Sequence, residues 1–232
     1  MIIIKSVKVS AVIIAYNEEK YIGQCLEALE TQEEKPDEII VVDNNCTDRT
    51  VEIAEKFDGV RIVKEEKQGM IYARNKGFDS AKYPLIVRCD SDTRVPKNWV
   101  KTIKRHFEEH PELSALSGPV RFFDVPKTGF TEFLANVYND GALIVYQHRI
   151  LDGPNLALKK EIWEKVRNKV CLIDKDVHED ADLAVHIHKE GGKIGYFRDI
   201  VVDSSGRRLL HNPTSFLLEY PWKHIKTRLR HL

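Results

Sequence analysis

The sequence is poor in cysteine, has no excess of either charge and contains no long apolar run. Its four cysteines are far apart and include no CxxC pair, which argues against a disulfide scaffold or a zinc ribbon and favours a reducing compartment. Basic and acidic residues balance at 36 each, which excludes a uniformly basic nucleic-acid coat protein. Lys5 and Lys8 interrupt the apolar start well short of the roughly 20 residues of a membrane span, and no signal-peptide cleavage site follows it. We therefore expect a cytoplasmic protein that binds no nucleic acid.

Two common phosphate-binding motifs are also missing. After the first apolar run, where a Rossmann enzyme carries G-x-G-x-x-G, this chain has AYNEE at residues 15–19. The glycine-rich GGKIG at residues 191–195 follows an expected helix, whose capping accounts for it. No G-K-[ST] occurs in the chain. A Rossmann dinucleotide enzyme and a P-loop NTPase are therefore disfavoured.

The chain does contain an alternation of short apolar runs and segments of helical period. Its 232 residues, 42% of them hydrophobic, are enough for one domain with a substantial core. Apolar runs at residues 9–15, 38–43, 60–63 and 85–89 precede helix-like segments at residues 21–30, 48–57, 70–80 and 99–109. Buried Ile/Val strands that alternate with amphipathic helices predict an α/β fold with a doubly wound, mostly parallel sheet.

Beyond residue 111 several prolines interrupt this alternation. We expect a strand at residues 115–123, a longer helix at 130–146, a helix at 179–190 and short strands at 194–197 and 200–203. Because no low-complexity linker separates the halves, the second half is expected to complete the same domain.

Polar residues follow each of the first four strands, at the edge where open α/β sheets bind their ligands. Asp90 and Asp92 come directly after the run at residues 85–89, and alternate residues of an extended chain project to one side. Two carboxylates on one side suit a divalent cation, Mg²⁺ or Mn²⁺, that also takes oxygens from a diphosphate and stabilises it as a leaving group. An Asx turn is the simpler interpretation of an isolated D-x-D, but the other strand-end carboxylates favour the metal site.

Five motifs in this order resemble glycosyltransferase family 2. They are SAVIIAYNEEKYI at residues 10–22, IVVDNNCTDRT at 40–50, ARNKG at 73–77, DSDT at 90–93 and the Glu179-Asp180 pair. The resemblance implies a fold of the nucleotide-diphospho-sugar transferase (GT-A) type at residues 1–205, followed by a basic, aromatic extension at residues 206–232. It also implies an inverting glycosyltransferase that depends on Mn²⁺ or Mg²⁺ and moves a sugar from a nucleoside diphosphate sugar to an acceptor hydroxyl.

The resemblance further implies which residues contact the donor. These are Tyr16, Asn17, Glu18, Asp43, Arg74, Asp90 and Ser91. The first three would line the nucleoside pocket, Asp43 would take the base or the ribose, and Arg74 would lie near the diphosphate or the sugar. Asp90 would reach the ribose or the metal-bound water.

Metal and acceptor contacts are implied in the same way. Asp92 would bind the metal, with Asp90 as a second candidate ligand. Independently of the resemblance, His211 could complete a metal or diphosphate site, because it follows the last expected strand beside Arg207 and Arg208. The turn that holds Gly153 and Asn155 resembles the family's turn beneath the donor sugar and the acceptor.

An inverting displacement needs one group to take the proton from the acceptor hydroxyl. On the helix expected at residues 179–190, Asp180 shares its stripe with the apolar Leu183 and Ile187, so it should point inward at the edge of the cleft. Glu179 shares its stripe with Asp182 and is expected to orient the loop or contact the acceptor. Asp180 also matches the family's Glu-Asp motif, whose Asp resembles the general base. The alternative is that these acids only favour the helix N-terminus electrostatically.

Three rival functions remain open. His178, Asp182 and His186 fall along one helix face and suggest a metal hydrolase, but H-E-x-x-H is absent and histidines on a polar face are usually solvated. A nucleotidyltransferase that makes the activated sugar would ordinarily carry a basic, glycine-rich loop after the first strand, where this chain is acidic. A non-catalytic nucleotide-sugar binder would not need an inward Asp180.

The C-terminal end is basic and aromatic. From residue 204 onward it holds six basic residues, Arg207, Arg208, Lys223, Lys226, Arg228 and Arg230, against the single acidic Glu219. Phe216, Leu217, Leu218, Tyr220 and Trp222 lie among them. Such a segment suits an anionic membrane surface, which would agree with peripheral attachment to the cytoplasmic membrane and a glycan or lipid-linked acceptor. Docking of the segment on its own domain is an equally good interpretation.

Overall fold

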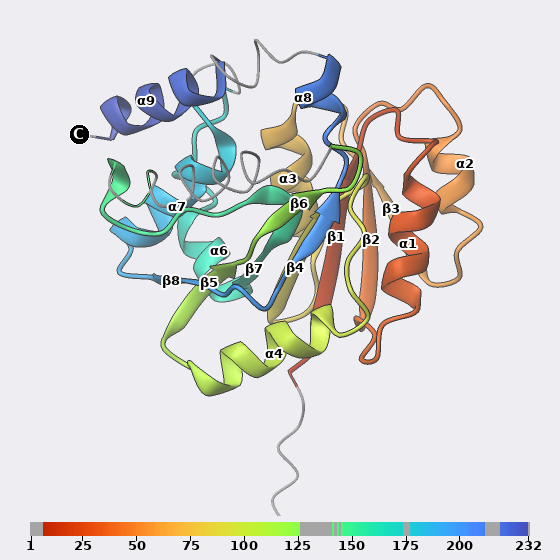
Figure 1. The fold of residues 1–232 in the computed structure, drawn as a ribbon, viewed down its shortest axis with the longest axis horizontal. Coiled ribbons are helices and arrows are strands. Elements are labelled where there is room, and N and C mark those ends of the chain that lie inside the picture. Colours follow the sequence, from red (N-terminus) through yellow and green to blue (C-terminus); the bar gives the residue numbers. More distant parts are fainter. Residues whose placement is uncertain are drawn as a thin grey trace, which may run out of the picture.

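A computed structural model shows the fold of residues 7–125, 141, 143, 145–173, 177–211 and 219–231. A seven-stranded sheet runs through it in the order β3-β2-β1-β4-β7-β5-β8 (Figure 1). One half is parallel and consists of β1 (Val9–Ala15), β2 (Glu38–Asp43), β3 (Val60–Lys64) and β4 (Leu85–Asp90). The other half contains β5 (Leu113–Ser117), β7 (Leu156–Lys159) and β8 (Lys193–Tyr196), with β7 antiparallel to both β4 and β5. The predicted α/β fold with a mostly parallel sheet is therefore confirmed.

Helices cover both faces of this sheet. The helices α1 (Ile22–Glu30) and α4 (Trp99–Glu109) pack on one face, and α3 (Met70–Ser80), α6 (Lys160–Val166) and α7 (Glu179–Lys189) pack on the other. Strand β1 is buried along its whole length, with Ala11 and Ile13 in the first core and Val12 and Ile14 in the second. Since side chains alternate along a strand, an unbroken apolar run is what a strand covered on both faces requires.

The predicted helix bounds at residues 70–80 and 99–109 are confirmed by α3 and α4, while α2 is shorter than predicted. It spans Thr50–Ala54 instead of residues 48–57. The side chain of Asp48 accepts a hydrogen bond from the backbone N–H of Thr50 (3.0 Å), so Asp48 forms a turn before the helix instead of its first residue.

The prediction of a single strand at residues 115–123 is wrong, because this stretch belongs to two separate strands. After β5 the chain breaks at Gly118 and Pro119 and continues as β6 (Val120–Phe122), which pairs in parallel with β9 (Val202–Ser204) in a separate two-stranded sheet. Proline has no N–H for a strand ladder. A Cβ atom on Gly118 would lie 2.3 Å from the carbonyl oxygen of Ile200, so only glycine allows the chain to pass there.

The C-terminal part forms α8 (Arg207–His211) and α9 (Tyr220–Arg230). Tyr146 donates a hydrogen bond to the carbonyl oxygen of His224 (2.8 Å), and the backbone N–H of His178 donates to Oγ1 of Thr227 (2.8 Å). Helix α9 therefore docks on the domain, next to α7 (Figure 1). The helix predicted at residues 130–146 lies mostly outside the described residues, as do Phe216, Leu217 and Leu218. Among the described helices, none has both the length and the apolar character that crossing a membrane requires.

Candidate donor and catalytic site

The carboxyl ends of β1, β2 and β4 meet at one edge of the sheet and border a pocket of about 220 Å³. Ala15 pairs with Asp43, and Ile14 pairs with Asp90, so these strands end in register. The residues that line the pocket are Ile14, Ala15, Tyr16, Glu18, Asn44, Gln68, Gly69, Met70, Ala73, Asp90, Ser91, Asp92 and Arg207. The fold thus brings together four of the predicted donor-binding residues, Tyr16, Glu18, Asp90 and Ser91, together with Asp92.

The loop after β1 is held in shape by residues that follow β2. Asn17 has a left-handed backbone (φ 55°), and its side-chain oxygen accepts a hydrogen bond from the backbone N–H of Thr47 (2.8 Å). The backbone N–H of Glu18 donates to Oγ1 of Thr50 (2.7 Å). Tyr16 is left exposed at the rim of the pocket, with 52% of its surface accessible. Asn17 therefore shapes the loop, and its neighbours line the pocket.

After β2 the pocket is lined by Asn44 and not by Asp43. The Asp43 carboxylate accepts a hydrogen bond from the backbone N–H of Cys46 (2.7 Å). The buried Asn44 accepts from the backbone N–H of Gly69 (2.9 Å) and donates to the carbonyl oxygen of Lys67 (2.7 Å). Asn44 thereby fixes the turn before α3, a role that sequence reasoning missed because the partners lie more than twenty residues away.

Three carboxylates converge in the pocket, from Glu18, Asp90 and Asp92. Arg207 on α8 contacts the Glu18 carboxylate and lies 3.4 Å from Oδ2 of Asp92. The remaining Glu18 oxygen, Oε2, is buried without a hydrogen-bond partner. Burial, and then the neighbouring charge of Asp90, raise the pKa of Asp92 to about 6. Because Arg207 reaches the pocket, the segment after residue 205 contributes to this site.

This donor set fits Mg²⁺ or Mn²⁺. Both ions prefer carboxylate oxygens, and an unpartnered, buried carboxylate oxygen is a group that a cation would satisfy. Glu18, Asp90 and Asp92 supply carboxylate oxygens to the pocket, and Oε2 of Glu18 is the buried, unpartnered one among the described residues. His211 is exposed at the end of α8 and does not line the pocket.

Arg88 joins this pocket to the predicted base, and sequence reasoning missed it. The guanidinium is fully buried and donates to Oδ1 of Asp90 (2.9 Å) and to Oδ1 of Asp180 (3.0 Å). The other Asp180 oxygen accepts the backbone N–H of Gly153 (2.9 Å). In the sequence, the only sign of this role is that Arg88 is a charged residue within the apolar run of β4.

Asp180 is inward, as the helical stripe predicted, and only 4% of its surface is exposed. Burial raises its pKa to about 7, and the charge of Glu179 adds to this, while Arg88 and Arg74 oppose it. Burial and the charge of Asp180 likewise raise the pKa of Asp152 to about 7. The two carboxyl groups therefore change their protonation state close to neutral pH.

Arg74 lies behind the pocket and not within it. It is fully buried, and it donates to the carbonyl oxygen of Glu179 (2.7 Å) and to the side chain of Asn75 (2.9 Å). A donor cannot touch a side chain that is fully covered by protein, so the predicted direct contact with the diphosphate or sugar does not agree with this position. Arg74 instead fixes the start of α7, next to Asp180.

The turn η1 (Gly153–Asn155) has a packing role that was not predicted. A Cβ atom on Gly153 would lie 2.7 Å from both the Arg88 guanidinium and the Asp180 carboxylate, so this glycine permits their contact. The Asn155 side chain is 1% exposed; it accepts from Trp99 (2.9 Å) and donates to the carbonyl oxygen of Ile200 (2.6 Å). Its burial does not agree with the predicted contact to the acceptor.

The outer face of α7 is also more buried than predicted. Asp182 is fully buried, accepts the backbone N–H of Cys171 (2.8 Å) and lies 2.8 Å from Nε2 of His231. His178 does not join Asp182 and His186, because its ring stacks on that of His224 (4.3 Å between centroids). The trio that suggested a metal hydrolase is therefore not assembled.

Known proteins resemble the chain in sequence and in fold. A dolichyl N-acetyl-alpha-D-glucosaminyl phosphate 3-beta-D-2,3-diacetamido-2,3-dideoxy-beta-D-glucuronosyltransferase of Methanococcus voltae is 24% identical over 212 residues, which are 80% of this chain and 63% of the relative. The solved mannosyltransferase PcManGT of Pyrobaculum calidifontis, in complex with GDP-Man and Mn²⁺, superposes with a TM-score of 0.77 at 21% identity, over 97% of this chain and 64% of that one. TarS of S. aureus in complex with UDP-GlcNAc superposes with a TM-score of 0.66 at 21% identity, over 86% of this chain and 59% of that one.

These matches confirm the GT-A type of fold. The chain spans 43–63% of the length of three curated relatives that it matches. The family model described as "Glycosyl transferase family 2" matches residues 10–166, which is more than half of the chain and includes the strand-end motifs of the pocket. The chain therefore belongs to glycosyl transferase family 2.

Proposed function

We propose that this protein transfers a sugar, with inversion, from a nucleoside diphosphate sugar to an acceptor hydroxyl. The observation that carries the proposal is the chain of contacts from Asp90 in the pocket through Arg88 to Asp180. It joins a donor pocket to a carboxylate that can accept a proton near neutral pH. The complexes of two solved relatives with the nucleotide sugars UDP-GlcNAc and GDP-Man support a donor of this class.

In this proposal the pocket holds the donor. Tyr16, Asn17, Asp43 and Ser91 contact or shape the nucleoside side. Glu18, Asp90 and Asp92 would hold Mn²⁺ or Mg²⁺, and Arg207 adds a cation beside them. His211 is not among these ligands, because it does not line the pocket. The metal ion, when bound, neutralises the diphosphate leaving group. The Mn²⁺ complex of the mannosyltransferase relative supports a metal of this kind.

Asp180 acts as the general base. The acceptor oxygen attacks C1 of the sugar, the bond from C1 to the diphosphate oxygen breaks, and the hydroxyl proton passes to the Asp180 carboxylate. A carboxyl group whose pKa is near 7 is ionised in a large fraction of molecules at neutral pH, and it is a stronger proton acceptor than an ordinary carboxylate. Arg88 and the backbone N–H of Gly153 hold this carboxylate in place, and Arg74 fixes the backbone of the preceding Glu179. Glu179 contacts the acceptor or orients its loop.

The rival functions are less well supported. A nucleotidyltransferase holds a triphosphate and needs cations after the first strand, whereas the loop after β1 contributes the carboxylate of Glu18 to the pocket. A non-catalytic binder gives no reason to bury Asp180 next to Arg88 at a cost in desolvation.

We further propose a lipid-linked acceptor at an anionic membrane surface on the cytoplasmic side. Helix α9 docks on the domain through His224 and Thr227, and exposes Trp222, Ile225 and Leu229 on another face. Its eleven residues include four basic ones and no acidic one. Apolar and basic side chains on one exposed helix suit a membrane interface. The dolichyl-linked sugar phosphate in the name of the Methanococcus voltae relative supports a lipid-linked substrate. We propose residues 1–205 as the main body of the catalytic domain and residues 206–232 as an extension that docks on it and adds Arg207 to the donor pocket.

The test uses the purified chain, a panel of UDP and GDP sugars, and Mn²⁺. Donor binding is measured by the rise in melting temperature, because a ligand that binds only the folded state stabilises it. Turnover is measured as release of the nucleoside diphosphate with and without lipid-phosphate acceptors. Binding of a donor without any turnover, unchanged in Asp180→Asn, would leave only the binding function.

A further inference from the structure

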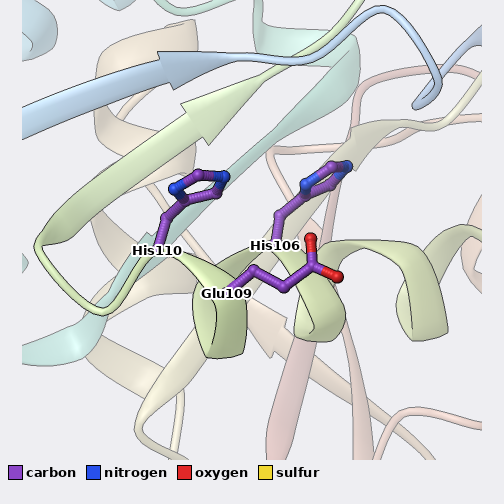
Figure 2. Close-up of side chains that lie close together, drawn as sticks. All are labelled: His106, Glu109 and His110. Carbon is purple, nitrogen blue, oxygen red and sulfur yellow. The ribbon is translucent and has the colours of Figure 1, made fainter.

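We propose that His106, Glu109 and His110, at the C-terminal end of α4, form a binding site for Zn²⁺ or a similar transition-metal dication. The three side chains lie together on one side of the helix (Figure 2). Each offers a ligand atom, and all three atoms lie within 4.8 Å of one another. The site is separate from the donor pocket, because α4 lies on the opposite side of the molecule from α8, which supplies Arg207 (Figure 1).

The spacing of these residues suits a metal. In HFEEH, residues 106–110, the two histidines are four positions apart and the glutamate is three after the first, so a helix presents all three on one face. Imidazole nitrogens with one carboxylate are a ligand set that zinc accepts, and H-x-x-E-H on a helix is a pattern found in zinc enzymes. Three protein ligands leave a fourth position for water.

His106 is prepared for ligation by its surroundings. Its Nε2 lies 2.9 Å and 3.0 Å from the two carboxylate oxygens of Asp199, and its ring stacks on Phe197 at 3.8 Å. A carboxylate on one ring nitrogen of a histidine fixes the proton there and leaves the other nitrogen with a free lone pair, as it does in many metal sites. The other nitrogen, Nδ1, is buried and has no hydrogen-bond partner, although the residue is only 6% exposed. An unpartnered buried acceptor is costly, and a metal ion would satisfy it.

The other two ligands are accessible. The Glu109 side chain is 56% exposed and lies 3.9 Å from Arg105, and the His110 side chain is 46% exposed and lies 3.8 Å from Glu112. Neither contact is as short as a hydrogen bond, so both side chains can turn towards an ion without losing a strong partner. A bound ion would clamp the end of α4 to the segment after β8 through His106 and Asp199.

A second group, Asp182, His186 and His231, is less suited to a cation. Both Asp182 oxygens already have partners, the backbone N–H of Cys171 and His231.

The test measures Zn²⁺ binding to the full, metal-stripped chain by calorimetry, in excess Mg²⁺ so that the carboxylates of the donor pocket are occupied. The half-exposed His110→Gln should fold and should weaken Zn²⁺ binding by at least about ten-fold. His106→Gln should abolish it, and the absorption spectrum of Co²⁺ reports histidine ligation independently. His188→Gln, an exposed histidine outside both groups, is the matched control and should bind as the unaltered chain does. Binding that survives His110→Gln, binding that is lost in His231→Gln instead, or no Zn²⁺ binding at all would overturn the proposal.

Discussion

Arg88 donates a hydrogen bond to Asp180 across 3.0 Å, and both side chains are buried. The same guanidinium donates to Asp90 in the pocket, 2.9 Å away. A buried cation between two carboxylates offsets their mutual repulsion and keeps them in one geometry, so removal of either partner leaves a buried charge uncompensated. The proposed catalysis and the stability of the fold therefore depend on the same contact.

Replacement of the proposed base should separate chemistry from binding. We expect Asp180→Asn to lower the rate of sugar transfer by about 10²–10⁴-fold, because the hydroxyl proton has no acceptor. The donor pocket does not include Asp180, so donor binding should persist. Nucleoside diphosphate release gives the rate, and thermal shift with the donor gives the binding. A variant that transfers sugar at the original rate would show that another group is the base.

Replacement of Arg88 should move the pH dependence of transfer. Arg88 lowers the pKa of Asp180, against the larger effect of burial, so in Arg88→Met this pKa should rise above its value of about 7. The base is active only when ionised, so the acidic limb of the kcat/KM profile should move to higher pH. Arg88→Lys retains the charge and should move the limb less.

A purely structural role for Arg88 predicts a different result, namely equal loss of activity at every pH. Both variants should also be less stable, by about 3–5 kcal/mol for the methionine, because it leaves buried carboxylates without their cation. The profile is therefore measured at a temperature where each variant is folded.

Asp152 should reduce stability at neutral and higher pH. Its pKa of about 7 lies above the value of about 3.9 in an unfolded chain, so between these pH values the folded state holds a proton that the unfolded state has lost. The free energy of unfolding contributed by this group is thus greatest below about pH 4 and decreases as the pH rises to about 7. The asparagine of Asp152→Asn cannot ionise. At pH 8 we expect this variant to be more stable than the unaltered chain by a few kcal/mol, the order of magnitude that corresponds to the pKa shift of Asp152. Near pH 4 the two proteins should differ little. Urea unfolding at both pH values measures this, and an equal effect at both would contradict it.

Much of the fold follows from local sequence, and much of the site follows from the fold. Strands β1 and β2 were predictable because each is an apolar run buried on both faces, and the carboxylates after β4 were predictable because such sheets bind ligands at that edge. Arg88 was not, because its partner Asp180 is 92 residues away and is brought near only by the antiparallel insertion of β7. The burial of Asp182 likewise depends on His231 from α9, a contact that no local pattern records.

Metal binding at the donor pocket should depend on Asp92. We expect Asp92→Asn to weaken Mn²⁺ binding by about 10–100-fold or more, since it removes one of three carboxylates that converge there. Calorimetry with Mn²⁺, with and without a nucleoside diphosphate, measures the change. The exposed Asp58, which does not line the pocket, gives the control Asp58→Asn, which should leave binding unchanged. Equal Mn²⁺ affinity in both variants would remove Asp92 from the proposed ligands.

Two helical glycines should respond in opposite ways to the same substitution. A Cβ atom on Gly77 of α3 would lie 2.4 Å from Cγ1 of Val12, a central residue of β1, so Gly77→Ala should force α3 away from the sheet and cost about 1–3 kcal/mol. A Cβ atom on Gly23 of α1 would meet only Ile53, at an ordinary 3.6 Å, so Gly23→Ala should be neutral or stabilising by up to about 1 kcal/mol through helix propensity. Urea unfolding of the two variants compares them directly.

Since α3 also carries Arg74, which binds the carbonyl oxygen of Glu179, Gly77→Ala should in addition lower transfer activity, whereas Gly23→Ala should not. Equal stability of the two variants would show that α3 does not need its close approach to the sheet.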